Sequence, residues 1–324
     1  MIKILFNSVL GIVLILIWAH FVNLEQIFQI ISKVSLPGLL PVFLFMLLSP
    51  VLRALRLKIF LSEIKKIKLL DLIFLNGSAM MLNFFIPIRM GEIAKGVFLN
   101  SRYNIHIGKA IIWVFMDRFV DFLAVLAIAG FLLIPTSLNI TFIKIIIIIL
   151  STCLILTYLA VFQKDFAQKI VKFLTPLFII KSIKIYFERF TSFILESFSI
   201  LRRHPKDLSL MLVVTILAYG ADAAIWFFTF LALSSPQNYF KMYLGQLLSA
   251  LTYLIPAAPG YVGSAEASGT LILSGVFGIN ANLASAMIVL FHILSAIFVI
   301  IFGLISIFSL KLDLGLIFKK AFRK

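Results

Sequence analysis

Two short segments of this sequence resemble each other and decide how the chain is expected to fold. Residues 82–91 read LNFFIPIRMG, and residues 251–260 read LTYLIPAAPG. A leucine, an aromatic residue, an isoleucine, a proline and a glycine coincide without a gap at an offset of 169 residues. Proline removes a backbone donor and glycine permits a sharp reversal, so each segment predicts a break in a helix.

The chain around these segments is apolar throughout. Of its 324 residues, 62% are hydrophobic and 13% charged, whereas a soluble domain is roughly a quarter charged. Runs such as Ile145–Ile149 leave no polar face for water, and the one cysteine, Cys153, has no partner for a disulfide within the chain. The composition excludes a soluble enzyme, a disordered chain and a secreted disulfide scaffold. It predicts an all-α, polytopic membrane protein.

Six stretches are long and apolar enough to cross a membrane, which takes about 20 residues. They are residues 4–22, 38–56, 108–134, 140–162, 208–233 and 282–309. Two more stretches, near 69–90 and 242–279, are interrupted by proline and glycine. No small-residue cleavage site follows the first stretch, so we expect it to be a retained helix rather than a signal peptide.

The charge pattern orients these spans. The formal net charge of +16 is better explained by topology than by nucleic acid, because cytoplasmic loops collect Lys and Arg. Such residues number six in 53–68, nine in 163–206 and five from residue 311 onward. Both termini are therefore expected in the cytoplasm, which requires an even number of crossings. Six spans satisfy this only if each interrupted stretch enters and leaves on the same side.

The prediction is a single membrane domain, residues 1–324, with six full spans and two re-entrant broken helices. Three spans separate the broken helices, so they face opposite sides and form an inverted repeat with halves 1–162 and 207–324. Amphipathic helices at the membrane surface are expected in 163–206, between the halves. Many secondary transporters place a substrate site near the midplane in this way. The helix-break residues are Pro87, Gly91, Pro256, Pro259, Gly260 and Gly263.

Charged residues within the spans are candidate site residues, since each costs roughly 2.5–3.5 kcal/mol at a helix centre. The third span contains Asp117, Arg118 and Asp121, and the last two are spaced to meet on one helix face. They form either an ion pair that locks helices together or a polar lining for a charged headgroup or a proton relay. Asp222, in the fifth span, is either a counter-ion to Arg118 or Arg89 or a protonation site.

The two helix breaks add further candidates. Arg89 is a fork-shaped donor that suits a phosphate; the alternative is an interfacial arginine that reaches lipid headgroups. Glu92 is expected to pair with Arg89 or with Lys95. Glu266, after the second break, is a candidate cation or proton site. His292, in the last span, is interpreted as a satisfied interior histidine.

Motifs for known enzyme chemistry are missing from the sequence. It has no Walker loop, zinc signature, nucleophile elbow or paired-cysteine motif. We therefore predict no catalytic residue, no cofactor and no metal. Membrane lipids are the expected partners and nucleic acid is not; a homo-oligomer is left open. The basic segments are attributed to orientation, with recruitment of anionic lipid as the alternative.

The motifs together resemble the lysylphosphatidylglycerol synthase/flippase transmembrane family. The resemblance covers nearly the whole chain and is carried by Asn83 with 87–92, by Asp117, Arg118 and Asp121, by Pro256, Pro259, Gly260 and Glu266, and by Arg53 and Arg56. Two positions depart from the family pattern. Asp117 stands where the family usually has Glu, and Tyr261 stands where a second glycine is common.

The resemblance implies a multi-pass protein of the cell (inner) membrane, without the soluble aminoacyl-transferase domain of the bifunctional members. The leading hypothesis is a lipid translocase, flippase-like, for a phospholipid or a lipid-linked anionic headgroup. Arg89 would hold the phosphate, and Asp117, Asp121, Asp222 and Glu266 would receive a cationic headgroup moiety or a coupling proton. The alternatives are a membrane-embedded transferase or hydrolase acting on a lipid-linked phosphate or sugar, and an accessory subunit of another envelope enzyme.

Overall fold

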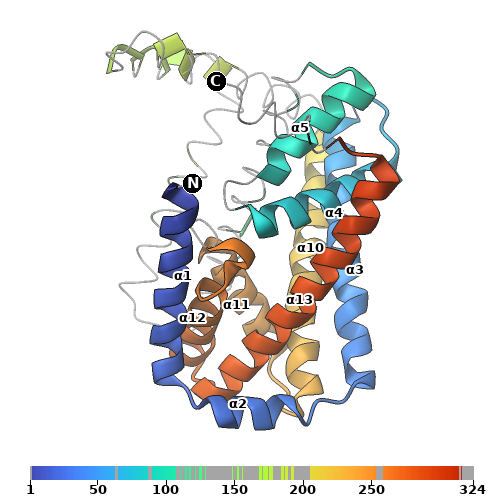
Figure 1. The fold of residues 1–324 in the computed structure, drawn as a ribbon. Coiled ribbons are helices and arrows are strands. Elements are labelled where there is room, and N and C mark those ends of the chain that lie inside the picture. Colours follow the sequence, from blue (N-terminus) through green and yellow to red (C-terminus); the bar gives the residue numbers. More distant parts are fainter. Residues whose placement is uncertain are drawn as a thin grey trace. The chain divides into compact units, whose positions relative to one another are not determined.

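The chain is all-helical over the part that the structure describes. The computed structural model describes residues 2–62, 65–86, 90–106, 205–252 and 258–313, with isolated residues and short pieces between 110 and 192 and residue 315. The helices are α1 (Ile2–Phe21), α2 (Leu24–Ile31), α3 (Leu40–Leu61), α4 (Leu69–Phe85), α5 (Met90–Tyr103), α10 (Pro205–Ala232), α11 (Tyr239–Thr252), α12 (Ser264–Leu271) and α13 (Ala281–Leu310) (Figure 1). Short turns are η1 (Pro37–Leu39), η2 (Thr175–Leu177), η3 (Pro259–Tyr261) and the π turn η4 (Ile272–Val276).

The chain divides into two compact units. Unit 1 consists of residues 1–54, 69–91 and 216–324, and unit 2 consists of residues 55–68 and 92–215. Both α3 and α10 contribute residues to each unit. This division follows spatial contacts, so it is distinct from the expected inverted halves, which stay a prediction.

Three described helices are long and apolar enough to cross a membrane. They are Pro37–Leu61, Ser209–Ala232 and Ala281–Leu310, which correspond to the predicted spans 38–56, 208–233 and 282–309. Together, α1 and α2 pass the same test as one bent pair, so the described residues supply three or four spans. The predicted spans 108–134 and 140–162, and the segment 163–206, lie almost entirely outside the described residues. The count of six therefore stays a prediction.

The first predicted span, 4–22, ends in a sharp bend rather than running straight on. The axis turns by 87° between α1 and α2. Asn23 has an extended backbone, and its side chain accepts the backbone N–H of Gln26 at 3.0 Å, which caps the start of α2. Ile27 is buried and Phe28 is exposed, so α2 is a short amphipathic helix. Figure 1 shows α2 beside the ends of α1 and α13.

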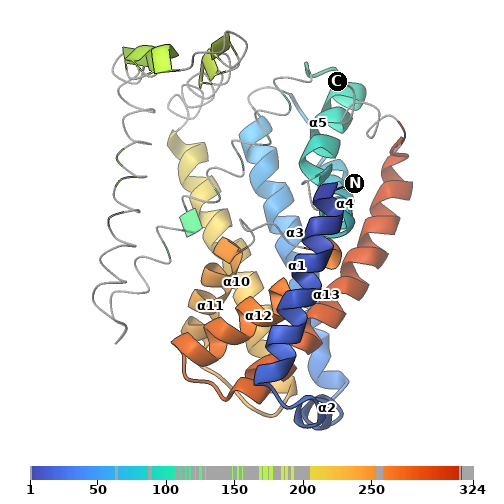
Figure 2. The same cartoon turned by 60° about the vertical axis from the view of Figure 1, so that its left-hand side comes forward.

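Unit 1 is built around α13. Gly303 brings α13 close to α4, because a Cβ at this position would lie 2.4 Å from the Cβ of Met81. The remaining faces of α13 join two apolar clusters, one with α10, α11 and η4 around Trp226, and one with α3 and α10 around Val42. On another side of the unit, α1 lies alongside α12, as Figures 1 and 2 show.

The two interrupted stretches consist of helices too short to cross a membrane alone. α4 has 17 residues and α11 has 14. At 1.5 Å per residue they are about 25 Å and about 21 Å long, against a hydrocarbon core of about 30 Å. Their lengths fit elements that reach partway into the bilayer.

Both breaks involve the expected glycines. At the first, the side chain of Asn83 accepts the backbone N–H of Gly91 at 2.8 Å, whereas Pro87 lies outside the described residues. At the second, Pro259 opens η3, and Gly260 and Gly263 have φ angles of 72° and 80°. These angles favour glycine because a side chain would clash with the backbone. The remaining expected break residue, Pro256, is also outside the described residues.

Candidate functional site

A buried ionic cluster in unit 2 is centred on Arg56 of α3, whose side chain is 1% exposed. Its Nε and Nη2 donate to the two carboxylate oxygens of Asp117 at 2.9 and 3.1 Å. Its Nη1 donates to Asp121 at 2.6 Å and to the hydroxyl of Thr215 at 3.2 Å. The fork of the guanidinium thus meets one carboxylate with two parallel hydrogen bonds, which is the strongest geometry for this pair.

This cluster differs from the sequence prediction in its cation. We expected Asp121 to meet Arg118, whereas the structure pairs Asp121 with Arg56, and Arg118 lies outside the described residues. The charge pattern assigned Arg56 to a basic cytoplasmic segment, 53–68. Instead α3 continues to Leu61, and the two aspartates satisfy Arg56 within the helix packing.

A second ion pair, in unit 1, joins α3 to α10. An Nη2 atom of Arg53 donates to one carboxylate oxygen of Asp222, and Ser49 donates to the other oxygen at 2.6 Å. The guanidinium carbon of Arg53 lies 5.0 Å from the ring centre of Tyr219, a cation–π distance. The sequence suggested Arg118 or Arg89 as the counter-ion of Asp222; the structure gives Arg53.

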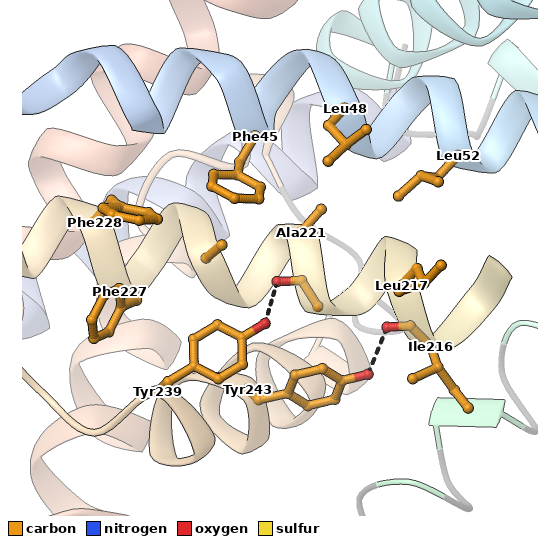
Figure 3. Close-up of a pocket in the computed structure, with 12 residues that line it drawn as sticks. Phe45, Leu48, Leu52, Ile216, Leu217, Ala221, Phe227, Phe228, Tyr239 and Tyr243 are labelled. Carbon is orange, nitrogen blue, oxygen red and sulfur yellow. Dashed lines mark hydrogen bonds between the residues drawn. The ribbon is translucent and has the colours of Figure 1, made fainter. Parts of the chain in front are cut away.

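An apolar groove of about 600 Å³ lies beside this pair. Its walls are side chains of α3 and α10, such as Leu48 and Phe228, and two tyrosines of α11. The hydroxyl groups of Tyr239 and Tyr243 donate to backbone carbonyls of α10 at 2.8 and 2.9 Å (Figure 3). The volume is within the range of ligand pockets, about 300–1,000 Å³.

Helical geometry places the groove next to the Arg53–Asp222 pair. Leu48 and Leu52 line the groove. Ser49 directly follows Leu48 and Arg53 directly follows Leu52, and both bond to Asp222. Neighbouring residues of a helix lie about 100° apart around its axis, because one turn takes 3.6 residues. The apolar wall and the ionic side chains therefore occupy adjacent faces of α3.

A third polar site joins α12 and α13 to the loop at the second helix break. Glu266 of α12 accepts the backbone N–H of Gly263 at 2.7 Å through Oε2 and contacts His292 of α13 through Oε1. The other ring nitrogen of His292 lies 2.7 Å from the carbonyl oxygen of Gly260. Both ring nitrogens of His292, on α13, are thus bonded to the segment that follows the break.

The remaining predicted residues lie near the first break. Glu92, in the first turn of α5, has its Oε2 atom 3.5 Å from the Nζ atom of Lys95, whose side chain is 2% exposed. Lys95 is one of the two partners expected for Glu92. The other, Arg89, lies outside the described residues.

Several contributing residues were missed from the sequence. The residues missed belong to apolar spans, to the second interrupted stretch or, for Tyr239, to the connection before that stretch, and no motif marks them. They are the hydroxyl-bearing Ser49 and Thr215 and the aromatic Tyr219, Tyr239 and Tyr243. One signal was present for the arginines, because Arg53 and Arg56 both fall inside the predicted span 38–56. A cation that interrupts an apolar stretch predicts a partner, although it does not say which.

Comparison with known proteins places the chain in a family. No curated protein sequence matches it. A family model, described as the lysylphosphatidylglycerol synthase TM region, matches residues 4–303. The match covers the ionic sites described above, and it connects the chain with membrane lipids. With its apolar spans and nearly the whole chain matched, the protein belongs to the lysylphosphatidylglycerol synthase TM region family and is a multi-pass membrane protein.

Proposed function

We propose that the protein is a lipid translocase that moves a phospholipid, or another lipid with an anionic headgroup, between the two leaflets of the membrane. The observation that carries this proposal is the Arg53–Asp222 pair beside an apolar groove. A lipid has the same two parts, a charged headgroup and an apolar chain. The groove suits an acyl chain, and the guanidinium of Arg53 suits a phosphate.

Exposure distinguishes the two arginines of α3. The side chain of Arg53 is 18% exposed and that of Asp222 is 12% exposed, whereas that of Arg56 is 1% exposed. A ligand can therefore approach the first pair. Separating a buried ion pair is costly if either charge is left alone. A headgroup that offers a phosphate to Arg53 and a cationic moiety to Asp222 would replace both partners at once.

The order of the helices supports the inverted repeat that such a mechanism requires. The two sequence segments that resemble each other differ by 169 positions. Shifted by this number, α3 falls on residues 209–230, which lie within α10. In the same way α4 falls on 238–254, over α11, and α5 falls on 259–272, over η3 and α12. One shift thus aligns three successive elements.

Arg53 and Asp222 are themselves 169 positions apart, so they are equivalent positions of the proposed repeat. When two equivalent positions touch each other, the contact lies on the two-fold axis that relates the copies, as in a symmetric dimer. Transporters with inverted repeats hold their substrates where the repeats meet, near the bilayer midplane. This coincidence favours the Arg53–Asp222 pair as the central headgroup contact.

The other charged residues keep their expected roles within the proposal. Arg89 contacts the phosphate at the first break. Asp117, Asp121 and Glu266 receive a cationic headgroup moiety or a proton. Their positions near the breaks and in the spans would let the headgroup exchange polar partners, which lowers the barrier of the hydrocarbon core.

The test is lipid movement in proteoliposomes that contain fluorescent phosphatidylglycerol, with a membrane-impermeant quencher to report the outer leaflet. Arg53→Gln removes the cation, and Lys58→Gln is the matched control, an exposed residue of the same helix. Losing a hydrogen bond to a charged group costs about 1.5–3 kcal/mol, so Arg53→Gln is expected to slow movement about 10- to 100-fold. The control is expected to stay within about twofold.

A charge-swapped variant, Arg53→Asp with Asp222→Arg, sharpens the test. Equivalent positions on a two-fold axis should tolerate the exchange, so the double variant is expected to recover stability that either single variant loses. Equal rates for Arg53→Gln and the control would refute the proposed site. New lipid species in expressing cells, without a change in leaflet distribution, would support the enzyme alternative instead.

A further inference from the structure

At the second helix break, a buried acid of α12 is in direct contact with a partly buried imidazole of α13. The side chains of Glu266 and His292 are 9% and 14% exposed. Their hydrogen bonds go to each other and to the backbone of the loop: Gly263 N–H to Oε2 of Glu266, and Nε2 of His292 to the carbonyl of Gly260. The two side chains thus connect α12, the loop 259–263 and α13.

The bonding pattern fixes the number of protons at this site. A carbonyl oxygen only accepts, so Nε2 of His292 carries a hydrogen and donates it to Gly260. The contact between Nδ1 of His292 and Oε1 of Glu266 then needs one more proton, located on either atom. Without that proton, a carboxylate faces a nitrogen lone pair. With a second one, two donors face each other. The contact is therefore made when the pair holds a single shared proton.

We propose that Glu266 and His292 form a proton-binding site that fastens the loop 259–263 to α13, and that this proton is the ion coupled to lipid movement. The coupling rests on the proposed lipid transport, whereas the proton site does not. A proton taken up from water bonds the pair and closes the loop. Its return to water breaks the Nδ1–Oε1 contact and frees the loop.

The loop is built so that this contact decides its position. Gly260 and Gly263 adopt positive φ angles, and the Gly263 N–H is held by Glu266 itself. The same carboxylate therefore caps α12 and binds the imidazole. Loss of its contact with His292 leaves a loop of glycine conformations with fewer bonds to hold it.

The site also touches the first interrupted stretch. Phe84, in the last turn of α4, lies with its ring centre 6.3 Å from the ring of His292 and 6.3 Å from the ring of Tyr261. α4 ends directly before the first helix break. A change of the loop at the second break is thus passed by contact to the helix that leads into the first break.

Other ionisable residues also occur on the elements of unit 1 that pack near α12 and α13. They are Lys3, His20, Glu25, Arg53, Asp71, Tyr219, Asp222, Tyr239, Lys241, Tyr243 and Tyr261. Arg53 and Asp222 bond to each other. Within the described part of the chain, Glu266 and His292 bond to each other and to the backbone of the loop, and to none of these residues. The loop geometry therefore depends on the proton shared by Glu266 and His292.

A spin label on the loop tests the proton site directly. Val262 is 44% exposed, so Val262→Cys in a Cys153→Ser background carries a nitroxide, and its mobility in nanodiscs is measured from about pH 5 to about pH 9, around the ordinary range of histidine. A one-proton transition is expected, with a mobile label at high pH. Glu266→Gln is expected to abolish it, because the amide donates to Nδ1 of the neutral imidazole and still accepts from Gly263, so the contact no longer needs a shared proton.

The controls separate this site from the rest of the chain. His20→Gln removes an exposed histidine of α1 and is expected to keep the transition. If Glu266→Gln does not fold, His292→Gln takes its place, since it also removes the titrating pair. A label without a transition, or a transition that survives in Glu266→Gln or His292→Gln, overturns the proton site.

Coupling is tested in the same proteoliposomes used for lipid movement, with and without a pH gradient. Lipid movement is expected to depend on the gradient, and Glu266→Gln is expected to lose that dependence. A spectroscopic transition without lipid movement would overturn the transport proposal and the coupling but leave the proton site standing. Lipid movement without a transition would overturn the proton site and leave the transport proposal standing.

Discussion

Replacing Arg56 with methionine tests whether the buried cluster of unit 2 holds the fold together. The substitution removes all four hydrogen bonds that Arg56 makes to Asp117, Asp121 and Thr215. Two carboxylates then remain in an apolar interior without their cation. Removing one partner of a buried ion pair costs about 3–5 kcal/mol. At roughly 2 °C per kcal/mol for a chain of this size, the Tm is expected to fall by about 6–10 °C.

A triple variant separates stability from function. Arg56→Met with Asp117→Leu and Asp121→Leu replaces the whole cluster by apolar side chains, which is often neutral or stabilising for buried ion pairs. Its Tm is expected to return close to that of the unmodified protein, whereas lipid movement is expected to be slow if Asp117 and Asp121 receive the headgroup or a proton as proposed.

Both measurements use the purified protein. Tryptophan fluorescence, from the three tryptophans of the chain, follows thermal unfolding in detergent, and the proteoliposome assay follows lipid movement. A Tm loss of less than about 2 °C for Arg56→Met would refute the burial argument, because it lies well below the cost of an unpaired buried charge. Recovery of both stability and lipid movement in the triple variant would show that the cluster only locks helices together.

Three further variants have expected outcomes. Arg89→Ala with Asp121→Ala should slow lipid movement at least about tenfold if both contact the headgroup; an unchanged rate would count against the proposed path. Gly263→Ala should lower the Tm by several degrees, since its φ is 80° and a Cβ would lie 2.1 Å from a carbonyl oxygen of α1. Gly275→Ala should not, because a Cβ there would meet only the side chain of Leu271, at an ordinary contact distance of 3.8 Å. Tyr243→Phe removes one hydrogen bond to α10 and should lower the Tm by about 1–3 °C.

The sequence predicted a span best where the length of its apolar stretch is enough to identify a membrane helix. The stretches 208–233 and 282–309 differ from α10 and α13 by at most three residues at either end, because over 20 apolar residues leave few alternatives to a membrane helix. The stretch 38–56 stopped short of Leu61, where α3 ends. A charged residue such as Arg56 lowers the hydropathy of a stretch and so marks its end. In the structure, Asp117 and Asp121 bond to Arg56 and the helix continues past it.

Ionic partners were the part of the site that sequence could not predict. Asp222 was predicted to be either a counter-ion to Arg118 or Arg89 or a protonation site, whereas its partner in the structure is Arg53. The two residues are 169 positions apart and lie on different helices, and hydropathy does not say which faces of two helices meet. Likewise, His292 is bonded as a satisfied interior histidine should be, but Glu266 as its partner emerges only from the packing of α12 on α13.

The two arginines of α3 are held in two different ways, and the difference matters for the proposed translocase. Arg56 is held at a side-chain exposure of 1% by two carboxylates, and Arg53 is 18% exposed beside an apolar groove. A cation sealed by its partners stabilises one arrangement, since its release would leave charges unpaired. A cation at a groove, on the proposed axis of the repeat, can exchange its carboxylate for a phosphate. The distinction implies that substitutions at Arg56 act first on stability and those at Arg53 act first on lipid movement.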